Sequence, residues 1–192
     1  MPDPATRESR IILVRHGETE ANRLGCFAAS DEIPRTHTGR EQAKTLAFSI
    51  QQQFRHGKIL SSEFLRARQT AEIIARQLGL RAEVITGIHE RDFGTLKGQA
   101  YREMGRIMQS DADYDPGKRW LWAPKSGESL ESVRLRAIGA LQEIQAFCSG
   151  EDVVVVSHGA VMESVAAHLS GDWENASVPQ NCGMIVVERC RL

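Results

Sequence analysis

Short apolar runs alternate along this chain with segments in which apolar residues recur every three or four positions. The runs predict β-strands, at 11–14, 58–61, 81–85, 153–157 and 184–190. The first and fourth runs are continuous enough to be buried on both faces, as strands of parallel sheets are. The helical spacing predicts helices at 43–54, 64–78, 100–108, 130–148 and 159–169. Thr38 followed by Glu41 is a capping-box pattern, which places the start of the first helix there.

Two segments lack either pattern and are predicted as long loops. The segment 22–34 contains Gly25 and Pro34, and the segment 111–127 is rich in Gly and Pro and reads as a loop or an inserted lid. Strands that alternate with helices predict an α/β fold: a three-layer αβα domain with a mostly parallel central sheet, helices on both faces and the last strand at an edge. A length of 192 residues favours one domain over 1–192, with a loop or lid elaboration around 99–127.

Composition narrows the class of protein. Lys plus Arg total 24 against 25 Asp plus Glu, and no basic block interrupts the chain, so nucleic acid is not an expected partner. The apolar runs are too short to cross a bilayer, and the polar start lacks the features of a signal peptide. We therefore expect a soluble, cytoplasmic protein without membrane attachment. The oligomeric state is not indicated. The cysteines lack metal-site spacing and are expected to be reduced, at positions Cys26, Cys148, Cys182 and Cys190.

Two of the predicted strands end in a histidine followed by glycine, as Arg15-His16-Gly17 and as Ser157-His158-Gly159. The glycine is expected to let the backbone pass close to a ligand and to expose its N–H group. Ligands of open α/β sheets bind outside the carboxyl ends of the strands, so both histidines face one site if the two strands are neighbours. The Arg15 guanidinium disfavours an imidazolium, which predicts a neutral, nucleophilic His16, and it offers a fork of donors that fits phosphate. The alternative is that each histidine is a core or turn residue whose hydrogen bonds are made within the protein.

Arg15-His16-Gly17-Glu18-Thr19, with Asn22 following, resembles the signature of the histidine phosphatase superfamily, which includes phosphoglycerate mutases. The resemblance continues in order along the chain, through Thr36-His37-Thr38-Gly39 with Gln42-Ala43, Ser61-Ser62-Glu63-Phe64-Leu65-Arg66-Ala67-Arg68-Gln69-Thr70-Ala71, Glu90-Arg91-Asp92-Phe93-Gly94-Thr95-Leu96-Lys97-Gly98, Gly127-Glu128-Ser129 with Arg136, Ser157-His158-Gly159 and Asn181. One Arg-His-Gly triplet is a weak signal, but the ordered set is a strong one.

The resemblance implies a role for each matching residue. His16 would attack phosphorus and become a phosphohistidine, and Glu90 would act first as general acid and then as general base. The phosphoryl oxygens would be held by Arg15, Arg66 and His158, with Asn22 as a further donor, so that basic side chains replace a metal and no cofactor is implied. For Glu90 the alternative is a surface carboxylate paired with Arg91. Glu18 and Arg136 are expected to be structural supports.

Some positions depart from the family pattern and bear on the substrate. Cys26, Ala28 and Ala29 stand where the family usually has a basic residue, a polar residue and glycine, and alanine side chains donate no hydrogen bond. Glu63 replaces a frequent proline, and Lys97 a frequent acid. Trp120 and Trp122 are expected to pack the long loop, with a wall of the pocket as the alternative reading.

The predicted function is a metal-independent phosphomonoesterase, a phosphatase acting on a small phosphate ester or another phosphorylated substrate. Sugar phosphates, phosphoglycerate-like acids, a ribazole phosphate and phosphoproteins all stay open as substrates. A cofactor-dependent phosphoglycerate mutase is one alternative, against which the short 99–126 segment and the two alanines count. A catalytically weak phosphate-binding module is another, although such proteins usually lose a catalytic residue. A metallohydrolase using His16, His158 and Glu90 is a further alternative that the spacing does not support.

Overall fold

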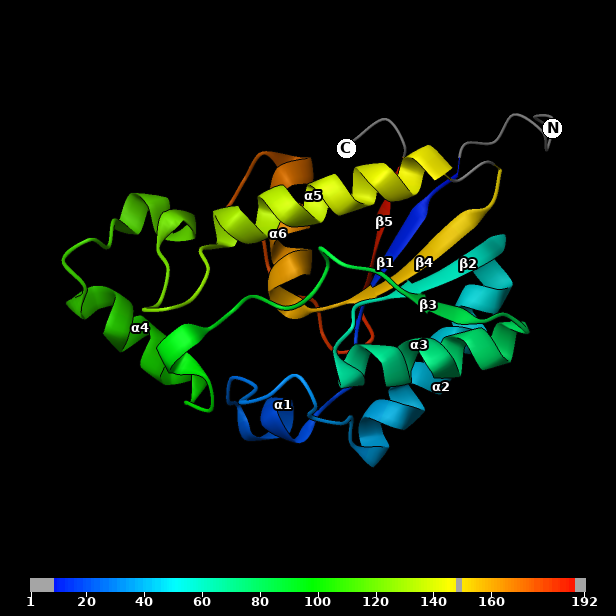
Figure 1. Cartoon of the computed structure of the whole chain (residues 1–192), viewed down its shortest axis with the longest axis horizontal. Coiled ribbons are helices and arrows are strands. Elements are labelled where there is room, and N and C mark those ends of the chain that lie inside the picture. Colours follow the sequence, from blue (N-terminus) through cyan, green and yellow to red (C-terminus); the bar gives the residue numbers. More distant parts are fainter. Residues whose placement is uncertain (1–8, 148–149, 189–192) are drawn as a thin grey trace.

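A five-stranded sheet forms the centre of the computed structural model, which describes residues 9–147 and 150–188 (Figure 1). The strands lie in the order β3-β2-β4-β1-β5, with the bounds β1 Ile11–Arg15, β2 His56–Ser61, β3 Ala82–Val84, β4 Asp152–Ser157 and β5 Met184–Val187. β5 runs antiparallel to β1 at one edge, and the other pairs are parallel. This confirms the predicted α/β fold with a mostly parallel sheet.

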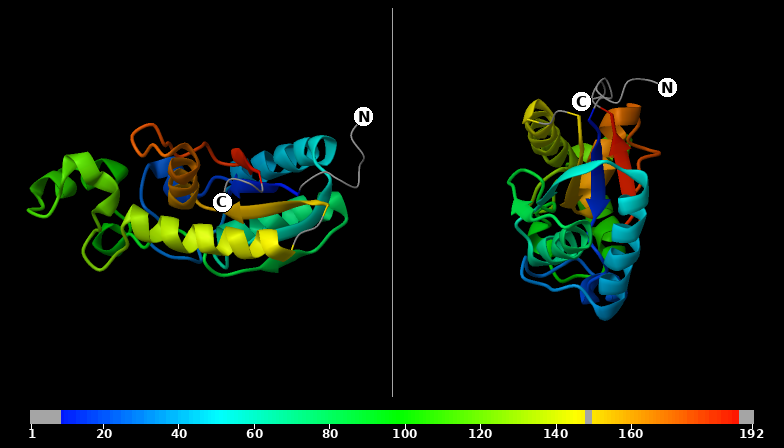
Figure 2. Two further views of the ribbon diagram at one scale, coloured as in Figure 1. Left: turned by 90° about the horizontal axis from the view of Figure 1, so that it is seen from above. Right: turned by 90° about the vertical axis from the view of Figure 1, so that its right-hand side faces the viewer.

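Helices cover both faces of the sheet, as the two rotated views show (Figure 2). The helices are α1 Glu20–Leu24, α2 His37–Gln53, α3 Leu65–Leu78, α4 Tyr101–Ser110, α5 Leu130–Phe147 and α6 Gly159–Ser170, with short 3₁₀ helices η2 Gly94–Leu96 and η3 Pro116–Leu121. α2 and α3 pack on one face, and α5 and α6 on the other. Among the described residues, no helix is long and apolar enough to cross a membrane.

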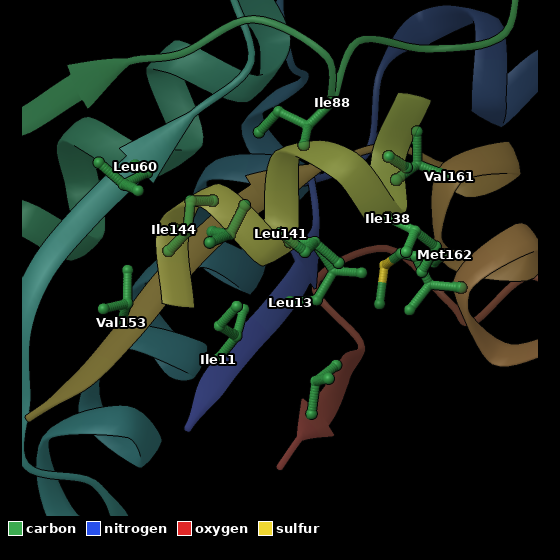
Figure 3. Close-up of a cluster of buried hydrophobic side chains, with 14 of the residues drawn as sticks. Ile11, Leu13, Leu60, Ile88, Ile138, Leu141, Ile144, Val153, Val161 and Met162 are labelled. Atoms are coloured by element: carbon green, nitrogen blue, oxygen red, sulfur yellow. The ribbon is translucent and has the colours of Figure 1, made fainter. Parts of the chain in front are cut away.

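The two central strands, β1 and β4, supply both cores because their side chains alternate between the faces. Ile11 and Leu13 point to the α5 and α6 side with Val153 and Val155, where Leu141, Ile138 and Met162 meet them (Figure 3). The residues between them, Ile12 and Val14 on β1 and Val154 and Val156 on β4, pack against α2 and α3. These strand residues are at most 2% exposed, so each contributes roughly 1.5–3 kcal/mol of hydrophobic free energy.

The register of β1 and β4 determines where the site lies. The strands are parallel neighbours, and Arg15 pairs with Ser157 at their carboxyl ends. The next residues, His16 and His158, therefore leave the sheet side by side. The structure thus confirms the condition on which a shared site was predicted.

Local expectations were wrong at two places. The predicted loop 22–34 overlaps α1, a five-residue helix too short to show periodicity, which Thr19 caps by accepting from the Asn22 backbone N–H. The N-cap of α2 is Thr36 rather than Thr38, because the Thr36 hydroxyl accepts from the Gly39 N–H and helical residues begin at His37.

The segment 99–127 extends away from the sheet, and α4 forms its outermost helix (Figure 1). Trp122 is buried with Phe27 and Leu96, whereas Trp120 stacks on Trp173 with ring centroids 5.7 Å apart. Both tryptophans therefore pack the segment, as expected. The predictions for Cys148, Cys190 and the first eight residues lie outside the described residues.

Candidate active site

A pocket of about 390 Å³ opens at the carboxyl ends of β1 and β4. Five of the predicted site residues line it: Arg15, His16, Asn22, Arg66 and Glu90. The sixth, His158, is fully buried next to the pocket, with its ring centroid 5.2 Å from that of His16. The structure thus brings all six predicted residues to one place.

One tautomer of His16 is favoured by its hydrogen bonds. Nδ1 lies 2.8 Å from the carbonyl oxygen of Gly17, which can only accept, so Nδ1 carries the proton. Nε2 then holds the lone pair and accepts a hydrogen bond from Arg66 Nε at 3.2 Å. The nitrogen with nucleophilic character therefore faces a guanidinium.

The sequence predicts only part of the reason why His16 is neutral. Burial lowers its pKa to about 3, with Arg66 as the next cause and Arg15 as a smaller one. The lowered pKa agrees with the predicted neutral imidazole. The predicted cause, the neighbouring Arg15, is secondary to the exclusion of water from a side chain that is 2% exposed.

His158 is held by Ser62, the residue that follows β2. Its Nε2 lies 2.8 Å from the Ser62 hydroxyl, and Nδ1 is buried without a hydrogen-bond partner among the described residues. Burial, followed by the charge of Arg66, lowers the pKa of His158 well below its usual value. Because buried polar atoms are nearly always paired, Nδ1 marks a place for a ligand atom.

Two guanidiniums, that of the buried Arg66 and that of the half-buried Arg15, give the site its positive charge. Arg15 donates from Nη1 to the Pro179 carbonyl at 2.7 Å, and its Nε is buried without a partner among the described residues. Arg66, in the first turn of α3, is 3% exposed. Burial is the first cause that lowers the pKa of both side chains. Buried cations are costly unless an anion offsets them, so this arrangement favours an anionic ligand.

Glu90 contacts the first turn of α6 rather than the Arg91 side chain. Its Oε1 accepts from the backbone N–H groups of Arg91 at 2.9 Å and Ala160 at 3.1 Å. The Arg91 guanidinium instead donates to the carbonyls of Glu128 and Trp122. The alternative reading of Glu90, a surface carboxylate paired with Arg91, is therefore wrong. Within the described chain both hydrogen bonds end on Oε1, so Oε2 is the oxygen left for other chemistry.

Asn22 lines the pocket from α1, but its amide is engaged with the protein. Oδ1 accepts from the Thr19 backbone N–H at 3.1 Å and from Asn181 Nδ2 at 3.2 Å. Nδ2 donates to the Tyr101 hydroxyl at 3.1 Å. Asn22 therefore connects the N-cap of α1 and the segment before β5 to the start of α4.

Glu18 and Arg136, which were expected to be structural supports, have that role. Glu18 Oε1 accepts from the Thr36 hydroxyl at 2.7 Å, which joins the segment after β1 to α2. Arg136 pairs with Glu128 and donates to the carbonyls of residues 87, 89 and 90, so it holds the segment that carries Glu90.

Three further residues were given no role by the sequence. Ser62 positions His158, Thr70 accepts the Gly17 N–H at 3.1 Å, and Tyr101 bonds to Asn22. The Gly17 N–H, expected to be open to a ligand, is thus used within the protein. Ser62 and Thr70 lie in a segment that matched the family pattern, which was the available signal. In the described part of the chain, no group of three or more His, Cys, Asp or Glu side chains is arranged to hold a metal ion.

Residues 11–190 match the model of the histidine phosphatase superfamily (branch 1). Phosphoglycerate mutase-like protein 4 of Arabidopsis thaliana is 32% identical over 160 residues, which are 82% of this chain and 69% of that protein. The metal-independent phosphoserine phosphatase of the same plant is 31% identical over 178 residues, covering 88% and 74%. The structure of phosphoserine phosphatase from Entamoeba histolytica with 3-phosphoglyceric acid is similar at a TM-score of 0.77, with 28% identity, covering 93% of this chain and 89% of that one.

The family match extends from the first residue of β1 to beyond β5. It therefore includes both strand-end histidines, and the relatives in sequence and in structure include phosphatases. The chain belongs to the histidine phosphatase superfamily (branch 1), as an enzyme of the histidine phosphatase type.

Proposed function

We propose that this protein is a metal-independent phosphomonoesterase that works through a phosphohistidine on His16. One observation carries the proposal: the buried, neutral His16 presents Nε2 in a pocket lined by Arg15 and Arg66. A neutral imidazole with its lone pair on Nε2 is the form able to attack phosphorus. Two guanidiniums beside it supply the charge that a phosphoryl group requires.

The phosphoryl group would be held by donors that the free site leaves unused. Arg15 Nε and His158 Nδ1 are both buried without partners among the described residues. Arg66 would turn its donors from His16 Nε2 to the phosphate oxygens, which releases the lone pair when substrate arrives. Asn22 would add a weaker contact because its amide is already engaged.

The first chemical step transfers the phosphoryl group to the enzyme. His16 Nε2 forms a bond to phosphorus, the ester P–O bond breaks, and protonated Glu90 gives its proton to the leaving alkoxide. The Nδ1–H bond to Gly17 persists and stabilises the positive charge on the phosphorylated ring. In the second step Glu90 takes a proton from water, the water oxygen attacks phosphorus, and the N–P bond breaks to release phosphate.

The test is hydrolysis of para-nitrophenyl phosphate in the presence of EDTA by the native chain and by His16→Ala. We expect activity that survives EDTA and falls at least about a thousandfold in the variant. Rapid quenching with ³²P-labelled substrate should trap acid-labile, base-stable label on the native chain. Circular dichroism checks that His16→Ala folds. Full activity in His16→Ala, or loss of activity with EDTA, would overturn the proposal. Isomerisation of phosphoglycerate dependent on bisphosphoglycerate would identify a mutase instead.

A further inference from the structure

The pocket has two chemically different ends. Beyond the phosphate end, one wall is formed by apolar side chains that belong to a single cluster, Phe27, Phe93, Met104 and Met108. Leu130 and Val178 also line the pocket. Ala28 also lines the pocket and brings no side-chain donor. A ligand that fills the pocket would therefore place its phosphate among cations and its alcohol part against hydrocarbon.

Helix α4 supplies two side chains of this apolar wall, Met104 and Met108. Met104 and Met108 are four residues apart and so lie on one face of the helix. Both pack against the buried cluster of Phe27, Leu96 and Trp122, which holds the wall in place. Methionine side chains are flexible and polarizable, so this face suits apolar groups of varied shape.

The charged groups at this end are already bound within the protein. Arg119 pairs with Glu163 at 2.9 Å and donates to the Trp173 carbonyl at 2.7 Å. The Arg91 guanidinium donates to two backbone carbonyls, those of Glu128 and Trp122. Turning either guanidinium toward a substrate carboxylate would break these bonds, whereas an apolar group leaves them intact.

We infer that the substrate is a phosphate ester of a largely apolar alcohol, aromatic or aliphatic, rather than of a small hydroxy acid or amino acid. This inference rests on the proposed phosphomonoesterase function and names the substrate class of the same pocket. A volume of about 390 Å³ accommodates a phosphate together with a group the size of a phenylpropyl chain.

A homologous series of esters tests the inference on the native enzyme. Ethyl, butyl, hexyl and 3-phenylpropyl phosphates share similar leaving groups and differ in apolar length, and phosphoserine and 3-phosphoglycerate are the polar comparisons. Each buried methylene should raise kcat/KM about fourfold, which gives roughly two-hundredfold from ethyl to hexyl phosphate. Both polar esters should be turned over more slowly than hexyl phosphate.

Variants of α4 test whether this wall provides the selectivity. Met104→Gln and Met108→Gln keep the side-chain length and add an amide. In each, the ratio of kcat/KM for hexyl over ethyl phosphate should fall about tenfold. The ratio is measured on one preparation, so any misfolded fraction cancels. Leu121→Gln is the matched control, because Leu121 belongs to the same segment but is 53% exposed and outside the pocket lining.

The outcomes separate the two proposals. If no ester in the series and no aryl phosphate is hydrolysed, the phosphomonoesterase function itself falls. If the esters are hydrolysed but the rate is flat with length, or phosphoserine or 3-phosphoglycerate is preferred, the function stands and the apolar substrate class is overturned. An unchanged ratio in both methionine variants would likewise overturn the role of the α4 wall.

Discussion

The His158 imidazole has one hydrogen bond in the described structure, between Nε2 and the Ser62 hydroxyl at 2.8 Å. That bond orients the ring and leaves Nδ1 without a partner among the described residues, and in the proposed reaction Nδ1 would bind a phosphate oxygen. Ser62 therefore acts on the proposed reaction through His158, as a positioning residue. Its hydroxyl also accepts the Phe64 N–H, which links the ring to the start of α3.

Ser62→Ala should lower kcat/KM for para-nitrophenyl phosphate about tenfold, because it leaves a buried imidazole nitrogen unpaired at a cost of about 1–3 kcal/mol. Ser62→Thr retains a hydroxyl and should restore most of the rate. Steady-state kinetics of both variants and of Ser110→Ala, an exposed control at the end of α4, provide the check. A loss of thermal stability in Ser62→Ala without a loss of rate would contradict the positioning role.

At the scale of secondary-structure elements, the segment that follows β1 approaches the start of α2 closely at two glycines. A Cβ on Gly17 would overlap the backbone oxygen of Gly39, and a Cβ on Gly39 would overlap the backbone of Glu18. Gly17 is thus required by the packing of its segment on the start of α2. The sequence-based explanation, exposure of its N–H to a ligand, was wrong.

Gly17→Ala should destabilise the protein by about 1–3 kcal/mol, since the clash is with backbone atoms that cannot rotate away. Gly105→Ala is the opposite case, because Gly105 lies within α4 and a Cβ added there would point into open space. It should stabilise α4 by about 0.5–1 kcal/mol. Urea unfolding of both variants measures the difference. If Gly17→Ala and Gly105→Ala had equal free energies of unfolding, the close contact between Gly17 and Gly39 would not restrict the side chain at position 17.

The elements that a sequence can predict are those in which the pattern of apolar residues extends over many positions. The strand-end histidines could be predicted to share a site only on the condition that their strands are neighbours, because the apolar runs predict buried parallel strands but not their order in the sheet. The five-residue α1 could not be predicted, because it is held by side-chain bonds of Thr19 and Asn22 rather than by a buried face. The partners of His158 and the inward face of Met104 depend on how separate segments meet, which spacing along one chain does not encode.

At the scale of the whole molecule, the buried histidines couple stability to pH. The pKa of His16 is lowered to about 3, and that of His158 is also lowered, while an unfolded histidine titrates near about 6.5. Below about pH 6.5 the unfolded state therefore binds more protons than the folded state. The free energy of unfolding must fall as the pH falls through this window.

Each of these histidines should contribute up to about 1.4 kcal/mol per pH unit to that slope. His16→Asn should remove one contribution, so its stability should depend less steeply on pH between about 7 and about 5. Urea unfolding across this range measures the slope. His37→Asn replaces an exposed histidine at the start of α2 and should keep the native slope. A native slope in His16→Asn would contradict the lowered pKa.

The two ends of the pocket come from different parts of the chain. The phosphate end comes largely from strand ends and α3, whereas one continuous stretch, 99–127, forms much of the outer wall. That stretch is fastened to α6 and the residues after it through Arg119 and through the stacking of Trp120 on Trp173. Exchanging this stretch alone would let protein engineers vary which alcohol the pocket accepts, because the residues proposed for phosphoryl transfer lie on other parts of the chain.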